Sequence, residues 1–397
     1  MDGNSAVERL VNSLQGPELL TKISWQEWQE IEPPYPETEF SRRNVFTRYN
    51  RNGYAWDIHG ILYTPEAEVD NSVAIVIFHG GAGSAIAKDI TPDGRPGIAP
   101  VMASQGFTVL SITYTGHYPP GGIWTMPIAE RMPIYLMDQD LSDEEIVDRN
   151  RKCTFNTIVQ GAAQLVEEHL AGRNILAYGH STGGPMAALL YKFLNKARVI
   201  GLLGFGSGGP DGWRKQWLEQ YNQPQKIKPI DAISRRSVQS FKDSGYNDSP
   251  DFVRPWGGAE EFMAEYDPIR SHFKLALRDN QHRGALAQLE QHHLLTDLPQ
   301  AEFFDHLDDP DASWLESIGV LLLVGENDRS HWQIGETDFD RCEVFIGGKY
   351  REHTERSHVI AIPNYSHYGI MELYNEKIPF TWLWAYKSGY FQTPTAC

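Results

Sequence analysis

The sequence predicts an α/β fold, in which a mostly parallel sheet of eight strands is covered by helices on both faces. Six short apolar runs contain almost no polar residue, as is typical of strands buried on both faces of a parallel sheet. Segments with apolar residues at helical spacing lie between several of these runs, and such alternation is typical of α/β folds. The runs are residues 73–78, 107–112, 174–178, 199–205, 320–324 and 358–362.

The two remaining strands are expected ahead of these runs, as an antiparallel hairpin at the edge of the sheet. Residues 45–49 and 54–63 are rich in β-branched and aromatic side chains, and a turn-forming Asn-Arg-Asn-Gly separates them. Apolar spacing predicts helices at residues 157–170 and 186–194 and in the tail from Gly369. Shorter helices at 7–14 and 25–31 are expected in an N-terminal arm, residues 1 to about 41, that packs on the domain.

A helical insertion is predicted late in the chain. Residues 207–313 show no strand pattern and contain several polar stretches with helical spacing. A structureless loop of that length is uncommon in a compact domain, so we expect a separate helical cap. The core is then formed by residues 1–206 and 314–397.

Composition excludes several classes of partner. The chain has 397 residues, 41% of them hydrophobic and 22% charged, with a formal net charge of −17. This charge disfavours nucleic acid and anionic lipid as partners. We expect no signal peptide and no membrane span, because no basic start precedes an apolar stretch and no long apolar window occurs. The cysteines Cys153, Cys342 and Cys397 are widely spaced, which favours free thiols, a cytoplasmic location and no metal site.

The most informative motif is Gly179-His180-Ser181-Thr182-Gly183, which lies between a predicted strand and a predicted helix. The pattern G-x-S-x-G in this context predicts a nucleophile elbow, a turn so tight that only small residues fit two positions before and after the serine. The turn raises the serine Oγ above the carboxyl ends of the strands, where ligands bind in open α/β sheets. The alternative is an ordinary glycine-rich turn. We predict that Ser181 is a catalytic nucleophile.

A serine nucleophile needs a base, and the base needs an orienting acid. In this topology the expected chain order is serine, acid, histidine. Asp328 follows the run at 320–324, and His367 follows the run at 358–362, so we predict that these two complete the triad. Glu326 and Asp211 are the rival acids. Most of the 14 histidines are expected to be surface or structural residues.

A glycine-rich loop follows the first apolar run as His79-Gly80-Gly81-Ala82-Gly83. Glycines allow backbone N–H groups to approach a ligand closely. We therefore expect an oxyanion hole formed by the N–H groups of Gly81, with Ala82 as the alternative, and of Thr182. The sequence does not satisfy the phosphate-binding patterns of nucleotide sites. The predicted substrate-binding residues are His79, Gly80, His180, Trp124 and Trp213.

With these motifs placed, the chain resembles the α/β-hydrolase superfamily. The matching motifs are His-Gly-Gly-Ala-Gly at 79–83, Gly-His-Ser-Thr-Gly at 179–183, Gly-Glu-Asn-Asp at 325–328 and Tyr-Ser-His at 365–367. The resemblance implies an inserted helical cap over the active site, with Ser181 as nucleophile, His367 as base and Asp328 as acid. The chain departs from the common pattern in a long polar stretch between Asp328 and His367 and in the segment after residue 113.

The predicted function is a serine hydrolase that cleaves a carboxylic ester or lactone of a small, largely apolar molecule through an acyl-enzyme, without a cofactor. The same triad serves ketone C–C hydrolases, amidases and acyltransferases, and these alternatives stay open. A catalytically silent ligand-binding homologue is the non-enzyme alternative. The expected partner is a small-molecule substrate, and a homodimer stays open.

Overall fold

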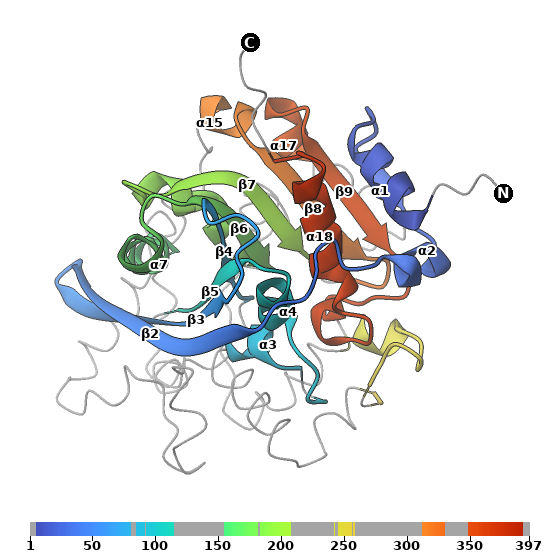
Figure 1. The fold of residues 1–397 in the computed structure, drawn as a ribbon, viewed down its shortest axis with the longest axis horizontal. Coiled ribbons are helices and arrows are strands. Elements are labelled where there is room, and N and C mark those ends of the chain that lie inside the picture. The colour runs from blue at the N-terminus through green and yellow to red at the C-terminus, as the bar shows by residue number, and fades with distance from the viewer. Residues whose placement is uncertain are drawn as a thin grey trace, which may run out of the picture.

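The computed structural model describes residues 5–80, 85–91, 93–114, 155–181, 183–207, 242, 245–255, 257–258, 312–329 and 348–391. These residues form one layered α/β structure around a single twisted sheet (Figure 1). The described helices include none with the length and apolar character needed to cross a membrane.

The sheet has nine strands in the order β1-β9-β8-β7-β6-β4-β5-β3-β2. Strands β2 and β3 form the antiparallel hairpin at one edge, β3 also pairs antiparallel with β5, and the remaining pairs are parallel. The mostly parallel sheet is thereby confirmed. The strand bounds are β1 Leu20–Lys22, β2 Phe40–Arg51, β3 Tyr54–Pro65, β4 Val73–Phe78, β5 Thr108–Thr113, β6 Asn174–His180, β7 Arg198–Phe205, β8 Gly319–Gly325 and β9 Ser357–Ile362.

The ninth strand, β1, was not predicted. Its three residues, Leu-Thr-Lys, are too few to show a periodic pattern, and only pairing with β9 makes them a strand. Thr21 Oγ1 lies 2.7 Å from Nε2 of His358, so a side-chain hydrogen bond also attaches β1 to β9. The expectation of eight strands is corrected to nine, because the N-terminal arm extends the sheet at its edge.

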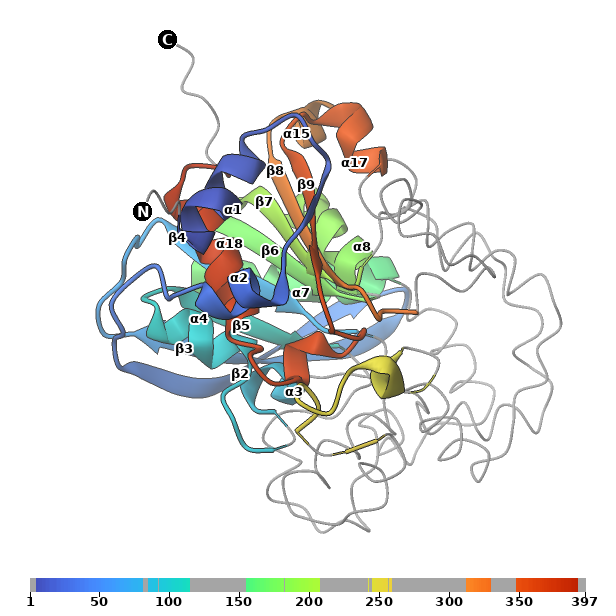
Figure 2. The same ribbon diagram turned by 90° about the vertical axis from the view of Figure 1, so that its right-hand side faces the viewer.

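Helices cover both faces of the sheet, as predicted (Figures 1 and 2). One face packs against α1, α2, α3, α4 and α18, and the other against α7, α8, α15 and α17. Every residue of β4, β5, β8 and β9 is buried, which explains why their sequences are largely apolar. The bounds are α1 Ala6–Leu14, α2 Trp25–Glu30, α3 Ile86–Asp89, α4 Ile98–Ser104, α7 Phe155–Leu170, α8 Gly183–Leu189, α15 Ala312–Glu316, α17 Gly348–His353 and α18 Lys377–Lys387.

One described piece of the predicted cap contacts the core near the carboxyl ends of β8 and β9. It comprises residues 245–255, includes the short helix η4 Tyr246–Asp248, and is yellow in Figure 2. Val253 O accepts a hydrogen bond from the N–H of Leu373 (2.9 Å), and Asp248 O accepts one from Nδ2 of Asn327 (3.3 Å). Most of the predicted cap, residues 207–313, lies outside the described residues.

Candidate active site

Ser181 occupies a sharp turn between the end of β6 and the start of α8. Its φ angle of 52° lies in the left-handed region, which a non-glycine residue rarely adopts. A Cβ at Gly179 would lie 2.4 Å from Cα of Gly184, and one at Gly183 would lie 2.5 Å from O of Phe78. Both positions therefore need glycine, as expected for a tight elbow, and the strained serine stands at the carboxyl end of a central strand.

His367 and Asp328 meet at the same edge of the sheet. Nδ1 of His367 donates a hydrogen bond to Oδ2 of Asp328 at 2.8 Å, and the Asp328 carboxylate is fully buried. The acid lies directly after β8 and the histidine directly after β9, so parallel pairing of these two strands brings the two loops together. Glu326, the nearby rival acid, is exposed, and the other rival, Asp211, lies outside the described residues.

The elbow contacts the loop of His367 through the residue that precedes the serine. Nε2 of His180 donates a hydrogen bond to the backbone carbonyl of His367 at 2.9 Å, and the two imidazole rings lie 4.9 Å apart between centroids. His180 is nearly fully buried, whereas Ser181 is partly exposed. The fold thus places the hydroxyl-bearing turn beside the buried imidazole–carboxylate pair.

The start of the glycine-rich loop after β4, residues His79 and Gly80, lies at the same place. A Cβ at Gly80 would lie 3.1 Å from Cβ of Ser181, so the backbone at Gly80 passes directly beside the elbow. The ring of His79 is fully buried and stacks on Tyr114 with centroids 3.6 Å apart. Gly81, Thr182, Trp124 and Trp213 lie outside the described residues, so the proposed oxyanion donors and both tryptophans remain predictions.

A sequence model of the alpha/beta hydrolase family matches residues 75–374, which is most of the chain. The chain belongs to the alpha/beta hydrolase family. Its matched region contains the glycine-rich loop, the elbow and the Asp328–His367 pair.

Among solved structures, the chain is similar to the following two at low identity. A haloalkane dehalogenase variant from Bradyrhizobium elkanii is 12% identical with a TM-score of 0.44, and the match covers 88% of this chain and 96% of that one. MenH from S. aureus is 14% identical with a TM-score of 0.40, with coverages of 83% and 98%. No match was found among curated proteins.

In this hydrolase, a buried carboxylate fixes the loop that carries His367. Oε1 of Glu372 accepts hydrogen bonds from Oγ of Ser366 (2.6 Å) and Oγ of Ser249 (3.1 Å), and Oε2 accepts one from the N–H of Ser366 (3.1 Å). Glu372 is fully buried, and burial raises its pKa to about 7 despite these donors. The residue before His367 is thus held through both its backbone and its side chain.

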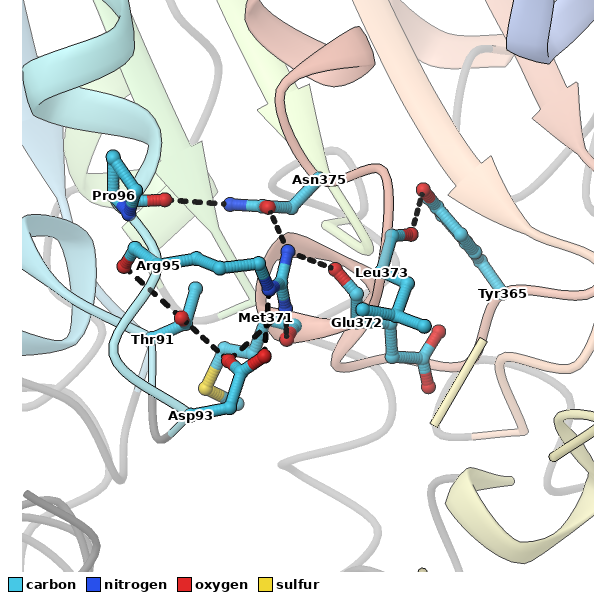
Figure 3. A network of polar contacts seen from close by, with 9 residues as sticks. All are labelled: Thr91, Asp93, Arg95, Pro96, Tyr365, Met371, Glu372, Leu373 and Asn375. Carbon is cyan, nitrogen blue, oxygen red and sulfur yellow. Dashed lines mark hydrogen bonds and ion pairs between the residues drawn. The ribbon is translucent and has the colours of Figure 1, made fainter. Parts of the chain in front are cut away.

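Arg95 holds the same segment from the other side, as Figure 3 shows. Its guanidinium donates to the backbone carbonyls of Met371 (2.9 Å) and Glu372 (3.1 Å) and to the side chain of Asn375. These carbonyls lie at the end of the short helix η6 Gly369–Met371. The guanidinium therefore satisfies carbonyls that have no helical partner and anchors the segment after His367.

Sequence reasoning did not identify Glu372, Arg95 or the buried Lys88. Two of them had a usable signal, because Glu372 is the single charged residue of the apolar stretch "YGIMELY" and Lys88 follows the apolar run Ala85-Ile86-Ala87. Charged side chains are rarely buried without a polar or charged partner, so both positions predict such a partner in the fold. Among the residues that the structure describes, no group of three or more His, Cys, Asp or Glu side chains could hold a metal ion.

Proposed function

We propose that the protein is a serine hydrolase that cleaves a carboxylic ester or lactone of a small, largely apolar molecule through an acyl-enzyme. One observation carries the proposal. The hydrogen-bonded pair of His367 and the buried Asp328 lies beside an elbow that holds Ser181 at a φ of 52°. A hydroxyl at such a turn, an imidazole and an orienting carboxylate are the parts that nucleophilic acyl transfer requires.

In the proposed reaction, Oγ of Ser181 attacks the ester carbonyl carbon while Nε2 of His367 accepts the hydroxyl proton. Asp328 keeps the His367 proton on Nδ1, so Nε2 is left with its lone pair toward the serine. The oxyanion is assigned to the N–H groups of Gly81 and Thr182. The tetrahedral intermediate then collapses, the C–O bond breaks, and the leaving alcohol takes the proton from His367. Water repeats the sequence on the acyl-enzyme and releases the acid.

Covalent labelling tests the proposal without knowledge of the natural substrate. A fluorophosphonate probe should phosphonylate Ser181 with loss of fluoride, and Ser181→Ala should abolish the label. Asp328→Asn should slow labelling roughly 10³- to 10⁴-fold, because the amide no longer favours the imidazole tautomer that accepts the serine proton. Folded wild-type protein that stays unlabelled would support the silent homologue instead.

The bond that is cleaved needs a second experiment. Aryl esters, lactones, anilides and vinylogous diketones should be compared under identical conditions, and we expect turnover of the esters or lactones. Preferential cleavage of a diketone or an anilide would replace the ester assignment with a C–C hydrolase or an amidase that uses the same residues. Transfer of the acyl group to an added alcohol in preference to water would indicate an acyltransferase.

A further inference from the structure

We propose that Lys88 and His180 form a positioning pair that holds the loop of His367 against the nucleophile elbow. This inference rests on the proposed function, because it assigns how the distance between nucleophile and base is maintained. Neither side chain is given a part in the chemistry itself.

The pair forms a continuous path of hydrogen bonds. Nζ of Lys88, in α3, lies 3.3 Å from Nδ1 of His180, and Nε2 of His180 lies 2.9 Å from the carbonyl oxygen of His367. A carbonyl can only accept, so Nε2 carries the proton, and Nδ1 of the neutral ring then accepts from the lysine. The His367 carbonyl and Lys88 therefore favour the same tautomer of His180, in which the proton is on Nε2.

The path joins three segments that are far apart in the sequence. Lys88 lies shortly after the glycine-rich loop, His180 immediately precedes Ser181, and the carbonyl belongs to His367 itself. One imidazole thus links the main chain of the proposed base to the residue next to the proposed nucleophile. A misplacement of about 1 Å between reacting groups can cost about 10²-fold in rate, so such a link affects catalysis directly.

Stability alone does not explain a lysine at this position. Lys88 is only 1% exposed, and among the described residues no charged group is found to act on its amine. Burial lowers the pKa of the Lys88 amine well below its usual value, which shows how costly the charged form is here. A methionine of similar length would fill the same space without that cost.

A packing role is the competing explanation. Nζ of Lys88 lies 5.9 Å from the centroid of the Tyr178 ring, on the strand that leads to the elbow. If this contact were the reason for the lysine, substitution would change stability and leave the rate at Ser181 unchanged. The positioning role predicts a slower labelling rate with unchanged stability, and the packing role predicts changed stability with an unchanged rate.

The experiment measures the first-order rate constant of phosphonylation at Ser181, the apparent affinity for the probe, and the urea unfolding curve. Lys88→Met should lower the rate constant about tenfold to a hundredfold with unchanged probe affinity, while stability stays equal or increases. His180→Leu should show the same loss. His180→Gln and Lys88→Gln retain an N–H donor and should recover most of the rate.

Tyr178→Phe is the matched control. Tyr178 lies beside Lys88, and its buried hydroxyl has no hydrogen-bond partner among the described residues. The Tyr178→Phe variant should be labelled at the wild-type rate. Lys88→Met protein that is labelled as fast as wild type would overturn the inference but not the proposed function. The same holds if all four variants at Lys88 and His180 lose rate and stability together. Wild-type protein without a Ser181-dependent label would overturn the proposed function, and the inference with it.

Discussion

At the scale of single residues, Gly206 shows how little space separates the acid from the base. Gly206 follows β7 with a φ of 53°, and a Cβ there would lie 2.8 Å from both Oδ2 of Asp328 and Nδ1 of His367. Its backbone therefore passes against the hydrogen bond that orients the imidazole. The absence of a side chain at Gly206 is a condition for that hydrogen bond.

We expect Gly206→Ala to slow phosphonylation of Ser181 by about 10²-fold or more, because the methyl group must push Asp328 and His367 apart. The variant should also lose about 1–3 kcal/mol of stability from its left-handed backbone. Gly172→Ala is the control, since Gly172 has a φ of 79° and no atom within 4 Å of the added Cβ. It should lose stability but keep the wild-type rate. Equal rates for the two variants would contradict the steric argument.

At the scale of elements, the loop between β9 and α18 is held from several sides. Glu372 binds Ser366, Arg95 binds two carbonyls of the loop, and the hydroxyl of Tyr365 donates to the carbonyl of Leu373 at 2.7 Å. The contacts of Glu372 and Tyr365 come from inside the loop, and Arg95 lies in the segment between α3 and α4. Ser249, a residue of the predicted cap, also donates to Glu372. The loop contains little helix or strand, but hydrogen bonds hold it at several points. Such a loop can keep the imidazole of His367 in one place.

The carboxyl of Glu372 gives this loop a measurable pH dependence. Its pKa is raised from 4.5 to about 7 in the folded protein, so the folded state keeps a proton that the unfolded state has already lost in that range. The contribution of Glu372 to stability therefore falls as pH rises from about 4.5 to 7. Glu372→Gln removes this titration, so the free energy of unfolding should fall less across the window, by about 3 kcal/mol at most.

Urea unfolding of both proteins at several pH values measures this difference. His358, whose pKa burial lowers to about 4, contributes an opposite slope, but it does so equally in both proteins and cancels in the comparison. Parallel curves for wild type and Glu372→Gln would show that Glu372 does not titrate in this range.

At the scale of the whole molecule, the N-terminal arm is part of the core. Strand β1 extends the sheet beside β9, and α2 buries Trp28 completely. Nε1 of Trp28 donates to the hydroxyl of Tyr365 at 3.1 Å, and the two rings pack edge to face with centroids 5.7 Å apart. The arm therefore contacts the loop of His367 through Tyr365.

Trp28→Ala should cost about 3–5 kcal/mol in the free energy of unfolding, because it leaves a large cavity and removes the indole N–H that donates to the Tyr365 hydroxyl. Phe46→Ala is the comparison, since Phe46 is 60% exposed on β2 and should cost less than about 1 kcal/mol. Denaturant unfolding followed by circular dichroism provides both values. Similar small costs for the two substitutions would show that the arm is not integral to the fold.

The parallel sheet, the edge hairpin, the helices on both faces and the tight turn at Ser181 could all be predicted from the amino-acid sequence. These features have local signatures, because the fully buried strands are largely apolar and the crowded elbow admits only glycine at positions 179 and 183. The chain order also predicted Asp328 as the acid and His367 as the base. The structure then showed which nearby acid contacts the histidine, since Glu326 is exposed while Asp328 is buried against it.

The ninth strand, the Lys88–His180 hydrogen bond and the partners of the buried Glu372 became known from the folded structure. Each depends on contacts between residues far apart in the chain, such as Thr21 with His358 or Lys88 with His180. The three residues of β1 form a strand only because they pair with the edge of β9. Lys88 meets His180 only when the chain folds, because the local sequence can mark a charged residue in an apolar stretch but not the distant residue that becomes its partner.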